Sequence, residues 1–281
     1  MPQDGLLAIF AHPDDETFAV GGTMARYADA GRPVTMICAT RGEVGEIAPG
    51  TGATPETLGT YREQELRDAC TILGVTDVRF LSFRDSGMQG TPDNDHPECL
   101  FRAASEAVVE PLVRAIRELR PTVIATWDAS GGYGHPDHIA VHQHATEAFH
   151  AAADGSRYPM AGAAWQANAL FYTAIPMSEF RRLGKEMAKR GVPMGEVPGG
   201  DENIAQLHHV EANCILDVSA QYERKMEALT AHRTQINESG PFGKMPEDLR
   251  RSFMSREYFF RATPPLAGGV LLDDLFVDLP V

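Results

Sequence analysis

Near its N-terminus the chain carries a run of five apolar residues, 6–10, that leads directly into the hexapeptide AHPDDE, residues 11–16. An apolar run followed by a proline turn and then a helical pattern predicts a buried strand, a sharp loop and the start of a helix. The hexapeptide thereby places His12, Asp14 and Asp15 at the carboxyl end of a first strand, where open α/β sheets bind their ligands. Asp14 or Asp15 could instead serve only as the helix N-cap, a position that Asp favours.

A second copy of the motif, HPDH at residues 135–138, follows another apolar segment. Along the first part of the chain, strand and helix patterns alternate, and this alternation predicts a Rossmann-like, doubly wound, mostly parallel sheet with helices on both faces. The expected strands are 6–10, 34–40, 78–83, 122–127 and 169–175, and the expected helices are 17–30, 60–73, 100–119 and a segment ending at 153.

The commonest strand order of such sheets, 3-2-1-4-5, reverses direction between the first and fourth strands. The two His-Pro-Asp loops follow these two strands, so we expect both loops to open into one crevice. The topology therefore predicts a single site built from His12, Asp14, Asp15, His135 and His138.

Beyond residue 176 the pattern loosens. We expect residues 1–176 to form the Rossmann-like core and residues 177–281 to form a smaller C-terminal α/β extension of the same structural unit, contributing to the substrate pocket. A surface helix is expected at 178–190, a Gly/Pro linker at 191–200, a short strand at 215–218 and a helix at 220–235. The apolar tail, 264–281, should dock either on its own domain or on another subunit, and we expect a homo-oligomer.

The formal net charge of −14 argues against nucleic acid or an anionic membrane surface as the main partner. We expect no signal peptide and no membrane insertion, because no apolar run is long enough to span a bilayer. The four cysteines are widely spaced without a CxxC pair, which predicts buried, reduced thiols and a cytoplasmic setting. They are Cys38, Cys70, Cys99 and Cys214.

Two imidazoles and a carboxylate that leave a coordination position open are typical of a catalytic zinc ion, and they also suit Fe²⁺. The HExxH spacing is absent, so such a site must be assembled from distant segments. A spare carboxylate could take a proton from water whose pKa the metal lowers, and a spare histidine could stabilise an oxyanion or protonate a leaving amine. These residue types indicate metal-assisted hydrolysis.

The AHPDDE hexapeptide, together with GHPDH at residues 134–138, resembles the motifs of the LmbE-like, or PIG-L, family of zinc-dependent N-deacetylases, which act on N-acetylglucosaminyl compounds. The similarity covers roughly the first 175 positions. It extends to Arg62-Glu63 and to RDSGM at residues 84–88. Glu16 and the GGYG segment at 131–134 resemble most the branch that makes or cleaves mycothiol-type glucosaminyl-inositol thiols.

The resemblance implies that His12, Asp15 and His138 hold the metal, with Zn²⁺ as the expected ion and Fe²⁺ as the alternative. It also implies that Asp14 is the general base. Asp14 as a simple N-cap remains the competing interpretation at this stage.

Other roles that the resemblance implies fall to residues around these. His135 would stabilise the oxyanion or donate a proton to the leaving amine, with Asp137 orienting its ring. Tyr133 would reach the oxyanion, although it could merely pack under the Gly-rich loop. Arg62 and Asp85 would contact the sugar or its aglycone, although Arg62 could simply pair with a helix carboxylate.

The leading hypothesis is a metal-dependent hydrolase that removes the N-acetyl group from a small N-acetylglucosaminyl substrate. The alternatives are an amidase that cleaves a larger acyl group from a glucosaminyl conjugate and a non-catalytic, metal-containing sugar-binding module. A dinucleotide-dependent dehydrogenase is disfavoured, because residues 11–22 supply no phosphate-binding glycine turn and the acidic loop would repel pyrophosphate.

Overall fold

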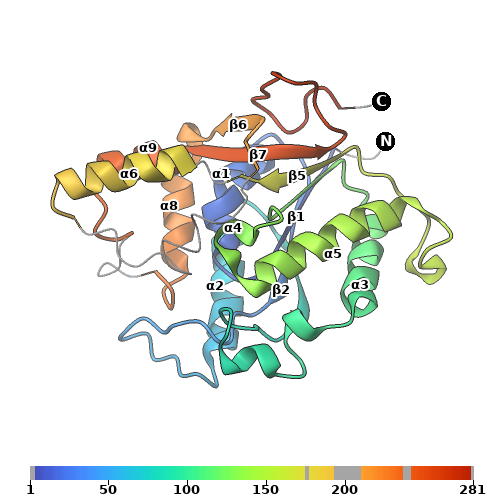
Figure 1. Ribbon diagram of the computed structural model, residues 1–281, viewed down its shortest axis with the longest axis horizontal. Helices are drawn as coiled ribbons and strands as arrows, with labels where there is room; N and C mark the ends of the chain where they lie inside the picture. Colours follow the sequence, from blue (N-terminus) through green and yellow to red (C-terminus); the bar gives the residue numbers. More distant parts are fainter. Residues whose placement is uncertain (1–3, 175–176, 193–209, 237–241, 280–281) are drawn as a thin grey trace.

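A seven-stranded sheet with the order β3-β2-β1-β4-β5-β7-β6 forms the centre of the protein (Figure 1). β1 to β5 pair in parallel, and β7 pairs antiparallel with both of its neighbours. The computed structural model describes residues 4–174, 177–192, 210–236 and 242–279. The strands are β1 (Leu6–Phe10), β2 (Val34–Thr40), β3 (Asp77–Phe83), β4 (Val123–Thr126), β5 (Ala169–Thr173), β6 (Cys214–Asp217) and β7 (Arg256–Thr263).

Helices pack on both faces of the sheet (Figure 1). Right-handed crossovers place α1 and α2 on one face, where α8 joins them, while α3 and α5 pack together on the other. The helices are α1 (Asp15–Asp29), α2 (Leu58–Leu73), α3 (Ser105–Leu119), α4 (Gly131–Gly134), α5 (Pro136–Ala153), α6 (Met177–Lys189), α8 (Tyr222–Ala231) and α9 (Glu247–Met254). Short 3₁₀ turns lie at Pro92–Asp95, Leu100–Arg102, Pro159–Ala161 and Ser219–Gln221.

The predicted doubly wound fold and the strand order 3-2-1-4-5 are confirmed. β1, β2 and β4 are buried along their whole length, as expected for parallel strands that are covered on both faces. β1 pairs directly with β4, from Leu6 opposite Val123 to Ala8 opposite Ala125. The loops that leave the carboxyl ends of these two strands are therefore neighbours.

The C-terminal residues extend the same sheet, since β7 pairs with β5 and β6 pairs with β7. β7 and α9 were not predicted. The buried side chains of β7 include the charged residues Glu257 and Arg261. The sequence of β7 therefore lacks the alternation of apolar and polar residues that marks a half-buried strand. Glu257 pairs with Lys225 at 2.6 Å, and Arg261 donates to the carbonyl oxygen of Pro264 at 2.9 Å.

The apolar tail docks on its own domain. Leu272 and Leu275 are buried, and the backbone N–H of Leu272 donates to the Asn213 carbonyl at 2.9 Å. Asp274 accepts a hydrogen bond from the Tyr27 hydroxyl at 2.9 Å. Of the two predicted docking modes, the tail adopts the one on its own domain. The tail therefore does not support the expected homo-oligomer, which stays a prediction.

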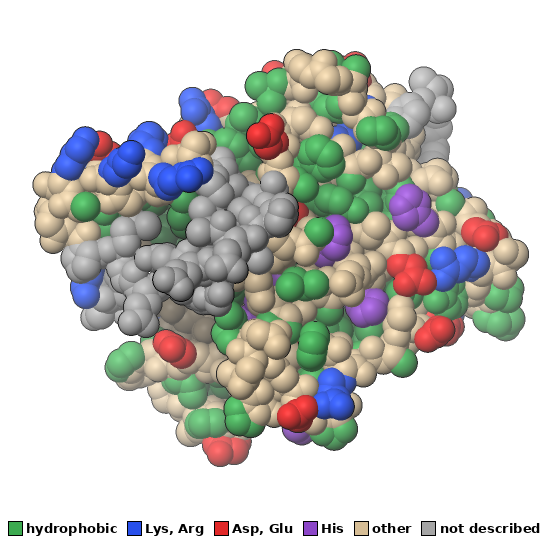
Figure 2. Space-filling view, viewed as in Figure 1, with side chains coloured by type: hydrophobic (Ala, Val, Ile, Leu, Met, Phe, Trp, Pro, Cys, Tyr) green, Lys and Arg blue, Asp and Glu red, His purple; other side chains and the backbone are tan. Residues whose placement is uncertain are grey.

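Two expected helices differ in detail. The helix expected at 100–119 begins only at Ser105, because Ala103 and Ala104 adopt extended backbone after a 3₁₀ turn. The expected surface helix is α6, which carries Lys and Arg side chains along its outer side (Figure 2) but buries Leu183 and Met187 beside Leu249 of α9. From residue 193 on, the expected linker lies outside the described residues.

All four cysteines are free and buried, as predicted. In the described part of the chain, no helix combines the length and the apolar character that crossing a bilayer requires.

Candidate active site

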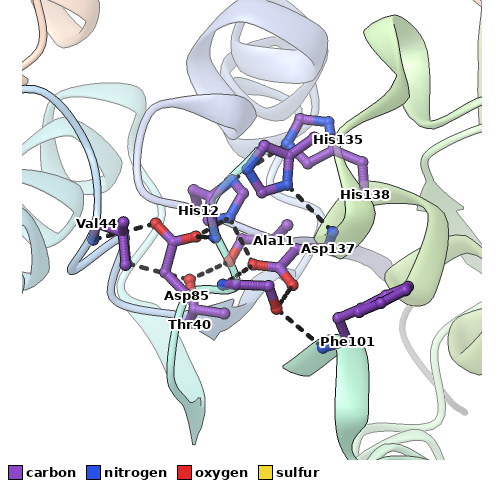
Figure 3. Close-up of polar contacts among 12 residues, drawn as sticks. Ala11, His12, Thr40, Val44, Asp85, Phe101, His135, Asp137 and His138 are labelled. Atoms are coloured by element: carbon purple, nitrogen blue, oxygen red, sulfur yellow. Dashed lines mark hydrogen bonds and ion pairs between the residues drawn. The ribbon is translucent and has the colours of Figure 1, made fainter. Parts of the chain in front are cut away.

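The two His-Pro-Asp loops meet in one site at the carboxyl ends of β1 and β4 (Figure 3). His12 follows β1, His135 is the N-cap of α5, and Asp137 and His138 lie in the first turn of that helix. Asp85, from the loop after β3, reaches the same place. These side chains are all at least nine-tenths buried, so the site is a shielded cluster of polar groups within the fold.

Three potential metal-ligand groups converge in this pocket. His12 Nδ1 lies 3.1 Å from His138 Nε2, and Asp15 Oδ1 lies 3.3 Å from the same nitrogen. Asp15 Oδ2 is 3.7 Å from His12 Nδ1. A tetrahedral zinc ion with bonds of about 2.0–2.1 Å places its ligand atoms about 3.3–3.4 Å apart. The two distances to His138 Nε2 are close to this spacing, so the three groups lie close enough together to share one metal ion.

Hydrogen bonds orient the rings of His12 and His138 so that Nδ1 of His12 and Nε2 of His138 face each other. His12 Nε2 donates to Asp137 Oδ2 at 3.1 Å and lies 3.5 Å from Asp85 Oδ1. His138 Nδ1 donates to the carbonyl oxygen of Gly131 at 3.1 Å. With their protons on these outer nitrogens, His12 and His138 turn lone pairs toward each other, which is the tautomer that metal-ligating histidines need.

Asp15 is held as a carboxylate. Its Oδ2 accepts hydrogen bonds from the backbone N–H groups of Ala11 and His12 at 3.1 and 2.9 Å. Burial opposes ionisation, but the neighbouring His138 and His12 lower the pKa of Asp15 below its usual range. The other oxygen, Oδ1, is therefore available to a metal ion.

His135 also lies within ligand distance of His12 and His138, but its tautomer differs. Its Nδ1 accepts the backbone N–H of Asp137 at 3.1 Å. Burial, followed by the two neighbouring histidines, lowers the pKa of His135 to about 2, so the ring is neutral and carries its proton on Nε2. Nε2 is thus a hydrogen-bond donor and not a metal ligand.

Asp14 occupies the N-cap position of α1, yet its side chain makes no capping hydrogen bond. The simple N-cap interpretation therefore does not describe its carboxylate. The side chain is 20% exposed, and its Oδ2 lies 3.4 Å from Arg62 Nη2. Burial raises the pKa of Asp14 to about 6, against the lowering effect of Arg62. Asp14 thus places an uncapped carboxylate with a raised pKa next to Asp15 in the chain.

The remaining predicted residues surround this centre. The ring of Tyr133 lies 4.9 Å from that of His138. Arg62 is buried and donates to the carbonyl oxygens of Gly42 and Pro13 at 2.9 and 2.6 Å, so it holds the loop that carries Asp14.

Comparison with known proteins identifies the family of the chain. Residues 7–149 match the sequence model of a family described as PIG-L, GlcNAc-PI de-N-acetylase. The chain belongs to the PIG-L family. A 1D-myo-inositol 2-acetamido-2-deoxy-alpha-D-glucopyranoside deacetylase from Geodermatophilus obscurus is 38% identical over 99% of both chains. A Thermobifida fusca protein with the same name is 40% identical over 90% of this chain and 91% of its own.

Solved structures share the fold at low identity. The N,N'-diacetylchitobiose deacetylase of Pyrococcus horikoshii is similar with a TM-score of 0.66 and 19% identity, over 92% of this chain and 84% of its own. The 4-carboxy-2-hydroxymuconate hydratase of Pseudomonas putida is similar with a TM-score of 0.62 and 16% identity, over 95% and 99%. Because one of these enzymes is a hydratase, the fold by itself does not determine the reaction.

One expectation drawn from the PIG-L resemblance needs correction. The Asp137 carboxylate does not orient the ring of His135. The backbone N–H of Asp137 donates to the ring of the N-cap residue His135, whereas the side chain of Asp137 makes its hydrogen bonds to other residues. The carboxylate accepts from His12 and from the backbone N–H and hydroxyl of Ser86.

Two residues of this PIG-L site were not singled out from the sequence. Ser86 lies in the RDSGM segment, but nothing in that segment shows that it binds Asp137. The Trp127 ring stacks on the His138 ring at 4.4 Å with an interplanar angle of 8°. The carbonyl oxygen of Trp127 also accepts a hydrogen bond from His142 Nδ1 at 2.9 Å.

Proposed function

We propose that the chain is a zinc-dependent N-deacetylase that hydrolyses the acetamide of an N-acetylglucosaminyl inositol to the free amine and acetate. The observation that carries the proposal is the convergence of His12 Nδ1, His138 Nε2 and Asp15, with the uncapped carboxylate of Asp14 beside them. The names of the full-length relatives supply the substrate class, because both are deacetylases of an N-acetylglucosaminyl inositol.

In the proposed reaction, His12, Asp15 and His138 hold the metal ion. The ion supplies Lewis acidity to the attacking water and to the acetamide carbonyl. Asp14 accepts the proton of the water as general base and passes it to the nitrogen of the leaving amine as the C–N bond breaks. His135 donates a hydrogen bond from Nε2 to the oxyanion that develops on the carbonyl, and Tyr133 reaches the same oxygen.

We assign the His12–Asp15–His138 set to zinc because two imidazoles and one carboxylate are a common donor set of catalytic zinc sites. Fe²⁺ accepts the same donors and is the alternative. Asp137 is then not a ligand but orients the ligand His12, because its carboxylate accepts a hydrogen bond from Nε2 of that ring.

For the substrate pocket, we propose that Arg62 contacts the sugar, because its Nε is buried without a hydrogen-bond partner. The Asp85 carboxylate already accepts backbone hydrogen bonds from Gly87 and Val44 and faces His12. We therefore assign Asp85 to the support of His12 and not to the sugar.

We also propose that residues 1–176 form the deacetylase core and that residues 177–281 form one structural unit with it and contribute to its pocket. The extension contacts the first turn of α1, where the Phe242 ring packs on the Phe18 ring with the two ring centroids 5.5 Å apart.

A comparison of acyl groups tests the proposed function. Zinc-loaded protein is incubated with N-acetylglucosaminyl inositol and with glucosaminyl inositol that carries a larger acyl group, and the free amine is measured. We expect faster release from the acetyl compound, because both full-length relatives are named as deacetylases of that compound.

Preferential cleavage of the larger acyl group would contradict the deacetylase proposal in favour of an amidase. Release from neither compound by protein that has bound its metal would favour a sugar-binding module.

A further inference from the structure

Asp14 has an unusual backbone conformation for a residue with a side chain. Its φ is 106°, in the region that favours glycine. Such a conformation is strained for a residue with a Cβ atom and persists only where the surroundings hold it. The conformation directs the carboxylate away from the α1 N-terminus, where an aspartate at the N-cap would ordinarily bond.

Glu16 contacts the backbone of Asp14 directly. Glu16 Oε2 accepts the backbone N–H of Asp14 at 2.9 Å. In a capping box the N3 glutamate reaches back to the N-cap N–H, and here Glu16, at N2, makes the equivalent bond. The other half of a capping box, a bond from the N-cap side chain, is absent here, so the Asp14 carboxylate is left for the site.

His232, a residue of the C-terminal extension, hydrogen-bonds to the Glu16 side chain. It is the C-cap residue of α8, and its Nε2 donates to Glu16 Oε1 at 2.8 Å. The Thr17 hydroxyl donates to the same oxygen. Both Glu16 and His232 are fully buried. A buried carboxylate is costly unless it is paired and hydrogen-bonded, and these contacts supply the partners of Glu16.

We propose that Glu16 and His232 are positioning residues for Asp14. Glu16 holds the Asp14 peptide in its left-handed conformation, and His232 fixes Glu16, so a residue of the C-terminal extension completes the geometry of the base. This inference rests on the proposed role of Asp14. Among the described interactions, neither residue hydrogen-bonds to the side chains of His12, Asp15 or His138, so their effect should fall on turnover and not on metal binding.

Four variants test the proposal by steady-state kinetics. Glu16→Ala and His232→Leu should lower kcat by about 100-fold with little change in KM, because a misplacement of about 1 Å can cost that factor. Glu16→Gln should recover much of the loss, since its amide oxygen can still accept the Asp14 N–H. Thr234→Val is the matched control: Thr234 lies in the same loop as His232, but its hydroxyl donates to Glu65.

A double-mutant cycle shows whether Glu16 acts through Asp14. If it does, Glu16→Ala should have little further effect on the residual rate of Asp14→Ala. An equal loss of rate in both backgrounds would overturn the proposal. So would a kcat of Glu16→Ala and His232→Leu within about twofold of that of Thr234→Val, since positioning was expected to cost about 100-fold.

Crystal structures provide a readout that needs no substrate. We expect a positive φ at Asp14 in the wild type and in Glu16→Gln, and a relaxed Asp14 with intact ligand geometry in Glu16→Ala. Unchanged Asp14 geometry in Glu16→Ala would refute the positioning role, whereas an inactive wild type with the expected structural changes would refute only the proposed function. If Glu16→Ala does not fold, His232→Leu is compared with the wild type in the same way.

Discussion

Replacement of Asp14 by alanine is expected to lower the rate of amine release by about 100- to 10,000-fold, the usual contribution of a general base. This loss corresponds to about 2.7–5.4 kcal/mol of activation free energy. The metal should remain bound, because the Asp14 carboxylate is not among the three converging ligand groups. The helix should also persist, since the side chain makes no capping bond that the substitution could remove.

The Asp14→Asn variant distinguishes the loss of proton transfer from the loss of side-chain size and contacts. The amide has nearly the size of the carboxylate and can still contact Arg62, but it does not accept the proton of the water. Both variants should therefore be similarly slow, with the metal content of the wild type by elemental analysis. A rate of Asp14→Asn close to that of the wild type would show that another group is the base.

Replacement of His138 by alanine is expected to abolish tight metal binding. The ring is fully buried, stacks on Trp127 and directs Nε2 at the converging ligand groups, so its removal leaves only His12 and Asp15 of the three. Metal at 100 times its dissociation constant stabilises a folded protein by about 2.7 kcal/mol. For a chain of this size, that is a rise in Tm of about 5–10 °C. The wild type should show this rise and His138→Ala should not.

His144→Ala is the matched control, because His144 lies on the same helix and its Nδ1 is 3.5 Å from the Ser105 hydroxyl, away from the site. It should keep both the metal and the thermal shift. Stoichiometric metal binding by His138→Ala would mean that the ion is held by the other close group of side chains, His12, Asp85, His135 and Asp137.

The main architecture and the place of the site could be predicted because local pattern and topology agree. The apolar strands 6–10 and 122–127 are short and uninterrupted, and each is followed by a His-Pro-Asp loop. Given that pattern, the reversal of strand order at β1 and β4 is enough to bring His12 and His138 together.

The supporting contacts could not be predicted because they join segments that are distant in sequence. Ser86 and Asp137 are 51 residues apart, and Glu16 and His232 are 216 residues apart. No local pattern marks such pairs. β7 was missed for a related reason, since the buried charge of Glu257 is explained by partners on other elements, Lys225 of α8 and the backbone N–H groups of Gly22 and Thr23 in α1.

The most direct test of the metal-dependent mechanism is a zinc titration of the metal-free protein, with amine release from N-acetylglucosaminyl inositol measured after each addition. The arrangement of His12, Asp15 and His138 predicts a rate that rises in proportion to the added metal and levels off at one equivalent. Full activity of the metal-free protein in the presence of a chelator would contradict the proposed mechanism.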